Sequence, residues 1–189
     1  MFQIVNINDI SKEDYEHYYS LMSGKRKIKV DSFRHEEDKK RSICGDMTAR
    51  KMIANLLSLP EDDIHILTDE KEKPYAENTD VFFNISHSGD YVLCVLTDSP
   101  VGADIEKIRK VDDNLVKRVC NPSELVYVFE DRDQKEIRFF MIWTAKEAYF
   151  KCKGTGINNM KNISSLDLDF QKHLQTFFEG DYVISIYTE

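Results

Sequence analysis

Two short acidic stretches of this chain could together bind a divalent metal ion. The first is Val101–Glu106 (VGADIE), which is expected to form a strand. Because side chains alternate along a strand, Asp104 and Glu106 should share one face, roughly 6–7 Å apart. The second, Trp143–Lys151 (WTAKEAYFK), reads as a helix and offers Glu147, 41 residues after Glu106. Mg²⁺ prefers a few carboxylates combined with substrate phosphates, so the three residues predict a Mg²⁺ site, with Mn²⁺ as an alternative.

Basic residues accompany these carboxylates, although each has a simpler explanation when taken singly. Lys146 and Lys151 lie on the same expected helix and would approach the negative charge that metal and phosphate share. However, alternating acidic residues are often only the solvated face of a strand. Glu147 and Lys151 also have the i,i+4 spacing of a surface ion pair, which is worth about 0.3–0.5 kcal/mol.

A second group of residues could bind phosphate. Ser86, His87 and Ser88 follow one another at the end of an expected strand, where hydroxyl and imidazole groups can donate hydrogen bonds to phosphate oxygens. The basic run 25–29, together with Arg41 and Lys73, could supply further charges. The two groups together predict a ligand that carries several phosphates and a metal. Taken alone, the basic run is more simply a solvated face and His87 a turn or core histidine.

Composition excludes several classes of protein. The 189 residues carry a net charge of −8, which argues against general nucleic-acid binding. The four cysteines, at positions 44, 94, 120 and 152, are widely spaced, so they predict neither a zinc site nor a disulfide framework. No signal-peptide pattern and no apolar run of membrane-spanning length is present. We therefore expect a cytoplasmic protein without membrane segments.

The pattern of apolar residues and turn signals predicts an α+β protein. Helices are expected over about 11–22, near 49–57, within 112–130 with a break at Asn121–Ser123, and over 136–153. Strands are expected at 2–5, at 64–67, three times between 82 and 106, and in a C-terminal pair at 166–170 and 182–186. Residues 69–77 read as a loop.

Three motifs in register resemble one known family. FNISHS at 83–88, VGADIE at 101–106 and WTAKEAYFK at 143–151 are similar, in this order and spacing, to the 4′-phosphopantetheinyl transferases of the surfactin-synthetase type. Lys73–Tyr75 lies where the family has an upstream lysine-proline motif, and the match covers roughly residues 20–157. Independent surface accidents would not reproduce three motifs of one family at its spacing, so the resemblance outweighs the simpler explanations of single residues.

The resemblance implies a fold of two similar α+β halves, 1–100 and 101–189, related by a pseudo-twofold axis with the active site in the cleft between them. By motif position it implies that Asp104, Glu106 and Glu147 bind the metal. Lys146 and Lys151, with Glu147, would be the catalytic residues. Contacts to coenzyme A are implied for a further set of residues, namely Arg26, Lys29, Ser42, Lys73, Ser86 and His87.

The implied reaction moves the 4′-phosphopantetheine group from coenzyme A to a serine of an acyl, peptidyl or polyketide carrier protein. It releases adenosine 3′,5′-bisphosphate, and the protein should act as a monomer. Either Glu147 or a metal-bound water could accept the serine proton. Two rival functions stay open: a metal-dependent nuclease, suggested by Asp104–Lys107, and a non-catalytic coenzyme A-binding or scaffold protein of the same fold.

Overall fold

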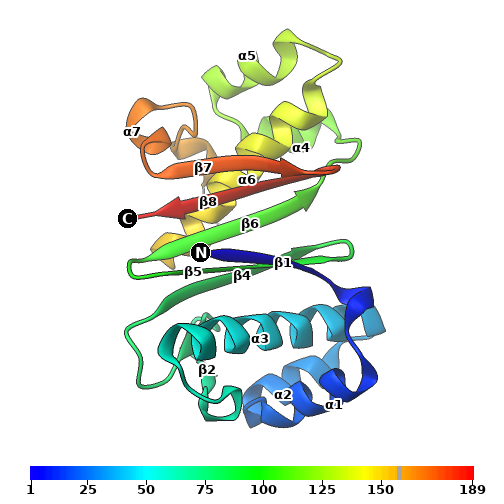
Figure 1. Ribbon diagram of the computed structural model, residues 1–189. Helices are drawn as coiled ribbons and strands as arrows, with labels where there is room; N and C mark the ends of the chain where they lie inside the picture. Colours follow the sequence, from blue (N-terminus) through cyan, green and yellow to red (C-terminus); the bar gives the residue numbers. More distant parts are fainter. Residues whose placement is uncertain (157–158) are drawn as a thin grey trace. The chain divides into compact units, whose positions relative to one another are not determined.

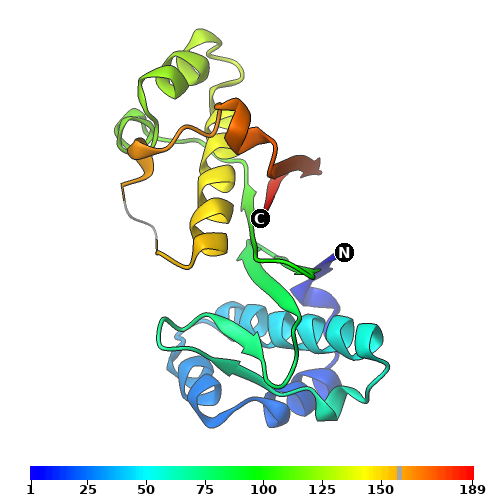
Figure 2. The ribbon, with the colours of Figure 1, turned by 90° about the vertical axis from the view of Figure 1, so that its left-hand side faces the viewer.

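The computed structural model describes residues 1–156 and 159–189, and the chain divides into two compact units, Met1–Ser99 and Pro100–Glu189. Each unit combines a three-stranded antiparallel sheet with one long helix packed against it. Figures 1 and 2 show these sheets and helices from two sides. The mixture of helix and sheet agrees with the α+β class expected from the sequence.

The first unit places its helices beside a sheet of strand order β1-β5-β4. Its main elements are β1 (Phe2–Asn6), α1 (Lys12–Leu21), α2 (Gly24–Ser32), α3 (Glu36–Leu57), β2 (Ile66–Thr68), β3 (Pro74–Ala76), β4 (Phe82–Ser88) and β5 (Tyr91–Thr97). Strands β2 and β3 form a separate pair. The long helix α3 packs on β5, and its apolar residues Ala49 and Ile53 join Phe83 and Leu96 in one core.

Helix α3 is longer than its apolar periodicity predicts. The sequence indicates only its C-terminal part, because residues 36–42 are charged or polar and show no apolar stripe. Three acidic residues in the first turn, Glu36, Glu37 and Asp38, complement the positive end of the helix dipole. The helix ends at Ser58, which adopts a left-handed conformation.

The second unit has a sheet of strand order β6-β8-β7. Its main elements are β6 (Val101–Lys107), α4 (Asp113–Val119), α5 (Pro122–Glu130), α6 (Lys135–Lys153), α7 (Leu168–Gln171), β7 (Leu174–Glu179) and β8 (Tyr182–Thr188). Asn121 caps α5 through a capping box with Glu124, as the break expected at this position suggests. Helix α6 ends at Gly154, which takes the left-handed conformation that is common at the C-terminus of a helix.

The expected strand at 166–170 is wrong. Residues Leu168–Gln171 form the short helix α7, and the strand that pairs with β8 lies later, at Leu174–Glu179. The alternation of Leu166, Leu168 and Phe170 does not mark a buried face, because Phe170 is buried while Leu168 is 83% exposed. The basic run 25–29 lies in helix α2, and the loop expected at 69–77 contains the short strand β3.

Helix α6 approaches strand β6 closely at Gly102. A Cβ atom built on Gly102 would lie 1.9 Å from the carbonyl oxygen of Ala148 and 2.3 Å from the backbone nitrogen of Cys152. Both atoms belong to the backbone of α6, so they cannot move aside as a flexible side chain could. Only glycine therefore permits this spacing between the helix and the strand.

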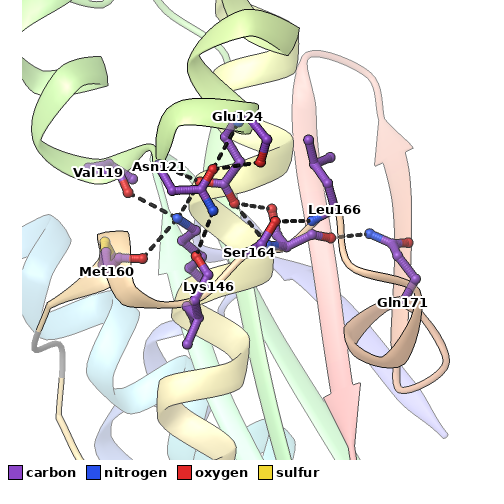
Figure 3. Close-up of polar contacts among 11 residues, drawn as sticks. Val119, Asn121, Glu124, Lys146, Met160, Ser164, Leu166 and Gln171 are labelled. Atoms are coloured by element: carbon purple, nitrogen blue, oxygen red, sulfur yellow. Dashed lines mark hydrogen bonds and ion pairs between the residues drawn. The ribbon is translucent and has the colours of Figure 1, made fainter.

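A buried network of hydrogen bonds holds residues 160–165 against α5 and α6 (Figure 3). The ammonium group of Lys146 donates to the carbonyls of Val119 and Met160 and to Oε2 of Glu124. The other carboxylate oxygen of Glu124, Oε1, accepts hydrogen bonds from the backbone N–H and the hydroxyl of Ser165. Lys146 and Glu124 are both fully buried, so this ion pair links α5, α6 and residues 160–165 inside the unit.

Within the described ranges, no helix is long and apolar enough to cross a membrane. All four cysteines are buried thiols. Cys94 lies in a core of the first unit, and burial raises the pKa of its thiol to about 12.

We expect Gly102→Ala to lower the free energy of unfolding by about 3 kcal/mol, because the new methyl group must displace backbone. Urea unfolding followed by circular dichroism would measure the loss. Gly24→Ala is the control, since nothing lies within 4 Å of a Cβ at that position. Equal unfolding midpoints for the two variants would contradict the close approach.

Lys146→Met should cost about 3–5 kcal/mol, because it leaves the Glu124 carboxylate buried without its cation. The double variant Lys146→Met/Glu124→Gln, which removes both charges, should recover much of this loss. Trp143 is the single tryptophan and lies on α6, so its fluorescence during urea unfolding reports on this unit. If the double variant were no more stable than Lys146→Met, the ion pair would not be the source of the effect.

Candidate functional site

The three carboxylates predicted to bind metal lie on β6 and α6. Asp104 and Glu106 alternate with buried Ala103 and Ile105, so they share the strand face of Gly102, which packs on α6. Lys151 reaches back from α6, and its ammonium group lies 2.6 Å from Oδ1 of Asp104 and 3.2 Å from the carbonyl oxygen of Ala103. The packing of helix on strand therefore brings two motifs together that are distant in sequence.

Glu147 is as deeply buried as Asp104 but lacks a cation at hydrogen-bonding distance within the described residues. It is 5% exposed and makes no hydrogen bond or ion pair with another residue that the structure describes. Burial raises the pKa of Glu147 to about 7, and the negative charge of Asp104 adds to this effect. The Lys151 cation partly opposes the rise, while Glu106 contributes to it. Asp104, Glu106 and Glu147 are thus close enough to repel one another electrostatically.

The donor set fits a hard divalent cation in chemical type and in charge. Three carboxylates that repel one another in a buried setting would be stabilised by a cation with oxygen preference. Two cations of the protein already hold part of the set, since Lys151 pairs with Asp104 and Arg109 Nη1 lies 2.8 Å from Oε2 of Glu106. In keeping with these pairings, no three acidic, histidine or cysteine side chains within 1–156 and 159–189 are arranged as ready metal ligands.

Lys146 lies in a different place from its neighbour Glu147. Its side chain is 0% exposed, and its three N–H groups are all used by Val119, Glu124 and Met160. In this arrangement it has no donor left for a ligand. The lysine expected to act in catalysis thus belongs to the buried network of Figure 3.

The first unit contains a cationic cavity of about 220 Å³. Its polar lining comes from α2, α3, β2, β4 and the connection between β2 and β3. The polar lining residues are Lys25, Arg26, Lys29, Arg41, Ser42, Thr68, Glu72 and His87. Four of the six residues expected to contact coenzyme A therefore line one cavity: Arg26, Lys29, Ser42 and His87. Four fixed positive charges around so small a volume make it suited to a phosphate group.

The other two expected contacts lie outside this lining. Ser86 is buried, and the alternation of β4 turns it to the face opposite His87 and Ile85, both of which line the cavity. Lys73 precedes the lining residue Pro74, and its backbone N–H donates to Oδ1 of Asp69, 2.8 Å away. The structure brings neither side chain into the cavity.

A buried carboxylate holds one of the cavity's arginines. Asp46 is 0% exposed, and its Oδ2 lies 3.0 Å from Nε of Arg26, while its Oδ1 accepts a hydrogen bond from Nε of Arg50. Arg50 is itself buried and donates to the carbonyls of Leu21 and Ile64. Asp46 and Arg50 thus fix Arg26 at the cavity wall.

Sequence reasoning missed these supporting residues. The i,i+4 spacing of Asp46 and Arg50 on one helix could have indicated an ion pair, but nothing local indicates that Arg26 joins it. Likewise, Asn121 and Glu124 are recognisable as a capping box, whereas the link from Glu124 to Lys146 exists only in the folded unit.

Comparison with known families gives a match for each unit. Residues 9–98 match the family model described as "4′-phosphopantetheinyl transferase, N-terminal". Residues 100–188 match the model of the 4′-phosphopantetheinyl transferase superfamily. The two matches meet near the boundary between the two compact units.

Individual relatives carry the same description. The chain is 33% identical over 151 residues to 4′-phosphopantetheinyl transferase Sfp of Bacillus subtilis (strain 168), covering 79% of this chain and 67% of Sfp. A second Bacillus subtilis 4′-phosphopantetheinyl transferase is 31% identical over 87% of this chain and 75% of its own length. 4′-Phosphopantetheinyl transferase gsp of Aneurinibacillus migulanus is 29% identical over 79% of this chain and 63% of its own length. The alignments thus span 63% to 75% of these relatives, and the chain belongs to the 4′-phosphopantetheinyl transferase family.

Proposed function

We propose that this chain transfers the 4′-phosphopantetheine group from coenzyme A to a serine hydroxyl of an acyl, peptidyl or polyketide carrier protein. The hydroxyl attacks the pantetheine-side phosphorus of the diphosphate, and adenosine 3′,5′-bisphosphate leaves. One observation carries the proposal: a buried carboxylate, Glu147, lies in a group with Asp104, Glu106 and Lys151. The names of the relatives support the same reaction.

Asp104, Glu106 and Glu147 would hold the metal ion, for which we propose Mg²⁺, with Mn²⁺ as an alternative. When bound, such an ion would offset the negative charge that builds on the diphosphate. Lys151 already lies beside Asp104, so its ammonium group could turn to a phosphoryl oxygen with little movement of the backbone. Positioning and charge stabilisation of this kind supply most of the rate in phosphoryl transfer.

We assign acceptance of the serine proton to Glu147, acting directly or through a water molecule. Asp104 and Glu106 each have a cation at hydrogen-bonding distance, Lys151 and Arg109, whereas Glu147 has none within the described residues. A base must reach the proton that it removes, and Glu147 lies next to Asp104 and Glu106, which would hold the metal ion with it. Lys146 receives a structural role in this proposal, because its donors are already used.

The cationic cavity would bind the 3′-phosphate of the coenzyme A nucleotide through Arg26, Lys29, Ser42 and His87. Arginine and lysine match the charge of a phosphate, and hydroxyl and imidazole groups add hydrogen bonds. We keep Lys73 and Ser86 as proposed coenzyme A contacts that would act through neighbouring parts of the ligand. They precede, respectively, the lining residues Pro74 and His87.

Glu147→Gln should reduce transfer by at least about 100-fold, because the amide is a poor metal ligand and cannot accept a proton. Intact-mass spectrometry of the carrier protein would measure the rate, and circular dichroism would show an unchanged fold. Glu136→Gln, a glutamate in the first turn of the same helix, is the matched control and should keep normal turnover. Near-normal turnover of Glu147→Gln would refute the assignment of this residue.

The reaction itself is tested with a panel of apo carrier proteins, each incubated with this protein, coenzyme A and Mg²⁺. We expect a mass gain of one phosphopantetheine on at least one carrier. It should be absent with EDTA, and absent when the acceptor serine is replaced by alanine. Binding of coenzyme A without transfer to any carrier would favour the non-catalytic coenzyme A-binding protein instead.

A further inference from the structure

Three of the four cations that line the cavity in the first unit are paired with carboxylates of the protein, whereas the Lys25 ammonium donates to the carbonyl of Asp69. Arg26 pairs with the fully buried Asp46, and Nη2 of Arg41 lies 2.6 Å from Oδ1 of Asp38. The ammonium group of Lys29 lies 2.8 Å from Oε2 of Glu72. A phosphate that enters the cavity therefore meets positive groups that already have partners.

Glu72 differs from the other two carboxylates in its position. It lines the cavity itself, whereas Asp46 and Asp38 are not among the described lining residues. Its side chain is 59% exposed and that of Lys29 is 56% exposed, while Asp46 is completely buried. An exposed pair is weak and screened by salt, so Glu72 can leave Lys29 at low cost.

The connection between β2 and β3 holds Glu72 at this position. The backbone N–H groups of Lys71 and Lys73 both donate to Oδ1 of Asp69, and that of Glu72 donates to the carbonyl of Asp69. Glu72 itself has a φ of +63°, a conformation that favours glycine. Backbone geometry alone would favour glycine at this position of the turn, but the chain has the long acidic side chain of Glu72 there.

Glu72 is an anion of the kind that the cavity is proposed to bind. The hydrogen bond from Lys29 holds the pKa of Glu72 below its ordinary value, and the charges of Lys29 and Lys25 add to this effect. The carboxylate is thus ionised at neutral pH. A ligand phosphate and the Glu72 carboxylate would be alternative partners for the same ammonium group.

We infer that Glu72 is a specificity-determining residue that takes the place of the ligand's 3′-phosphate at Lys29. This inference rests on the proposed binding of coenzyme A in the cavity. A ligand with the phosphate must displace Glu72, which weakens its binding. A ligand without the 3′-phosphate leaves the Lys29–Glu72 pair intact and incurs no such loss. Glu72 should therefore reduce the preference of this chain for coenzyme A over 3′-dephospho-coenzyme A.

Isothermal titration calorimetry with coenzyme A and with 3′-dephospho-coenzyme A tests the inference on the full chain. Glu72→Gln keeps the shape of the side chain and removes its charge. We expect it to tighten coenzyme A binding about two- to five-fold, the range of an exposed ion pair, and to leave 3′-dephospho-coenzyme A unchanged. Glu70→Gln is the matched control, because Glu70 is exposed in the same turn and pairs with no described residue.

The pair itself is isolated in the background Lys29→Gln, where Glu72→Gln should no longer tighten coenzyme A binding. Equal tightening of both ligands, an equal effect of Glu70→Gln, or no change in coenzyme A affinity would each overturn the inference. If the wild-type chain bound neither ligand, the proposed function would fail by itself. Titration with inorganic phosphate, followed by NMR, would then test the role of Glu72. If Glu72 competes with phosphate for Lys29, the Glu72→Gln variant must bind inorganic phosphate more tightly than the Glu70→Gln variant does.

Discussion

The direct contact between the backbones of α6 and β6 at Gly102 is the constraint on which the candidate catalytic residues depend. Side chains of ordinary size at this point would hold the helix further from the strand. At the observed spacing, the Lys151 ammonium group reaches Asp104, and Glu147 feels the charges of both β6 carboxylates. The glycine of the VGADIE motif thus serves the site without carrying any chemistry of its own.

Adjacent residues of α6 illustrate two ways of burying a charge. Lys146 is fully compensated, because the Glu124 carboxylate and two carbonyls take all its donors, and the result is a rigid link between three segments. Glu147 is buried without such a partner, and its raised pKa records the cost of ionising it there. An uncompensated buried carboxylate is a common feature of functional sites, because a bound cation or a proton in transit can relieve it. In α6, therefore, Lys146 stabilises the fold, and the next residue, Glu147, is the candidate functional group.

In the first unit, too, ion pairs of different burial have different roles, but there the candidate ligand-binding groups are cations. Asp46 is fully buried and pairs with both Arg50 and Arg26, so a buried charge positions Arg26 at the wall of the cationic cavity. The pair Lys29–Glu72 is exposed and weak, so it can respond to a ligand. The buried pairs of Asp46 thus support the cavity wall, whereas the exposed Lys29–Glu72 pair can be broken by a ligand. The cations of the cavity belong to one unit and the carboxylate group to the other.

The sequence by itself determined the class, the family and most of the elements. Glycine and proline punctuation and alternating apolar residues are local signals, and three motifs in order identify the family. Local patterns did not determine which side chains meet. They could not show that Lys146 turns inward while Glu147 stays with Asp104, that Ser86 faces away from His87, or that Leu168 opens a short helix. Those outcomes depend on how helix and sheet pack, because the energy of burying a charge or an apolar face is set by neighbours distant in sequence.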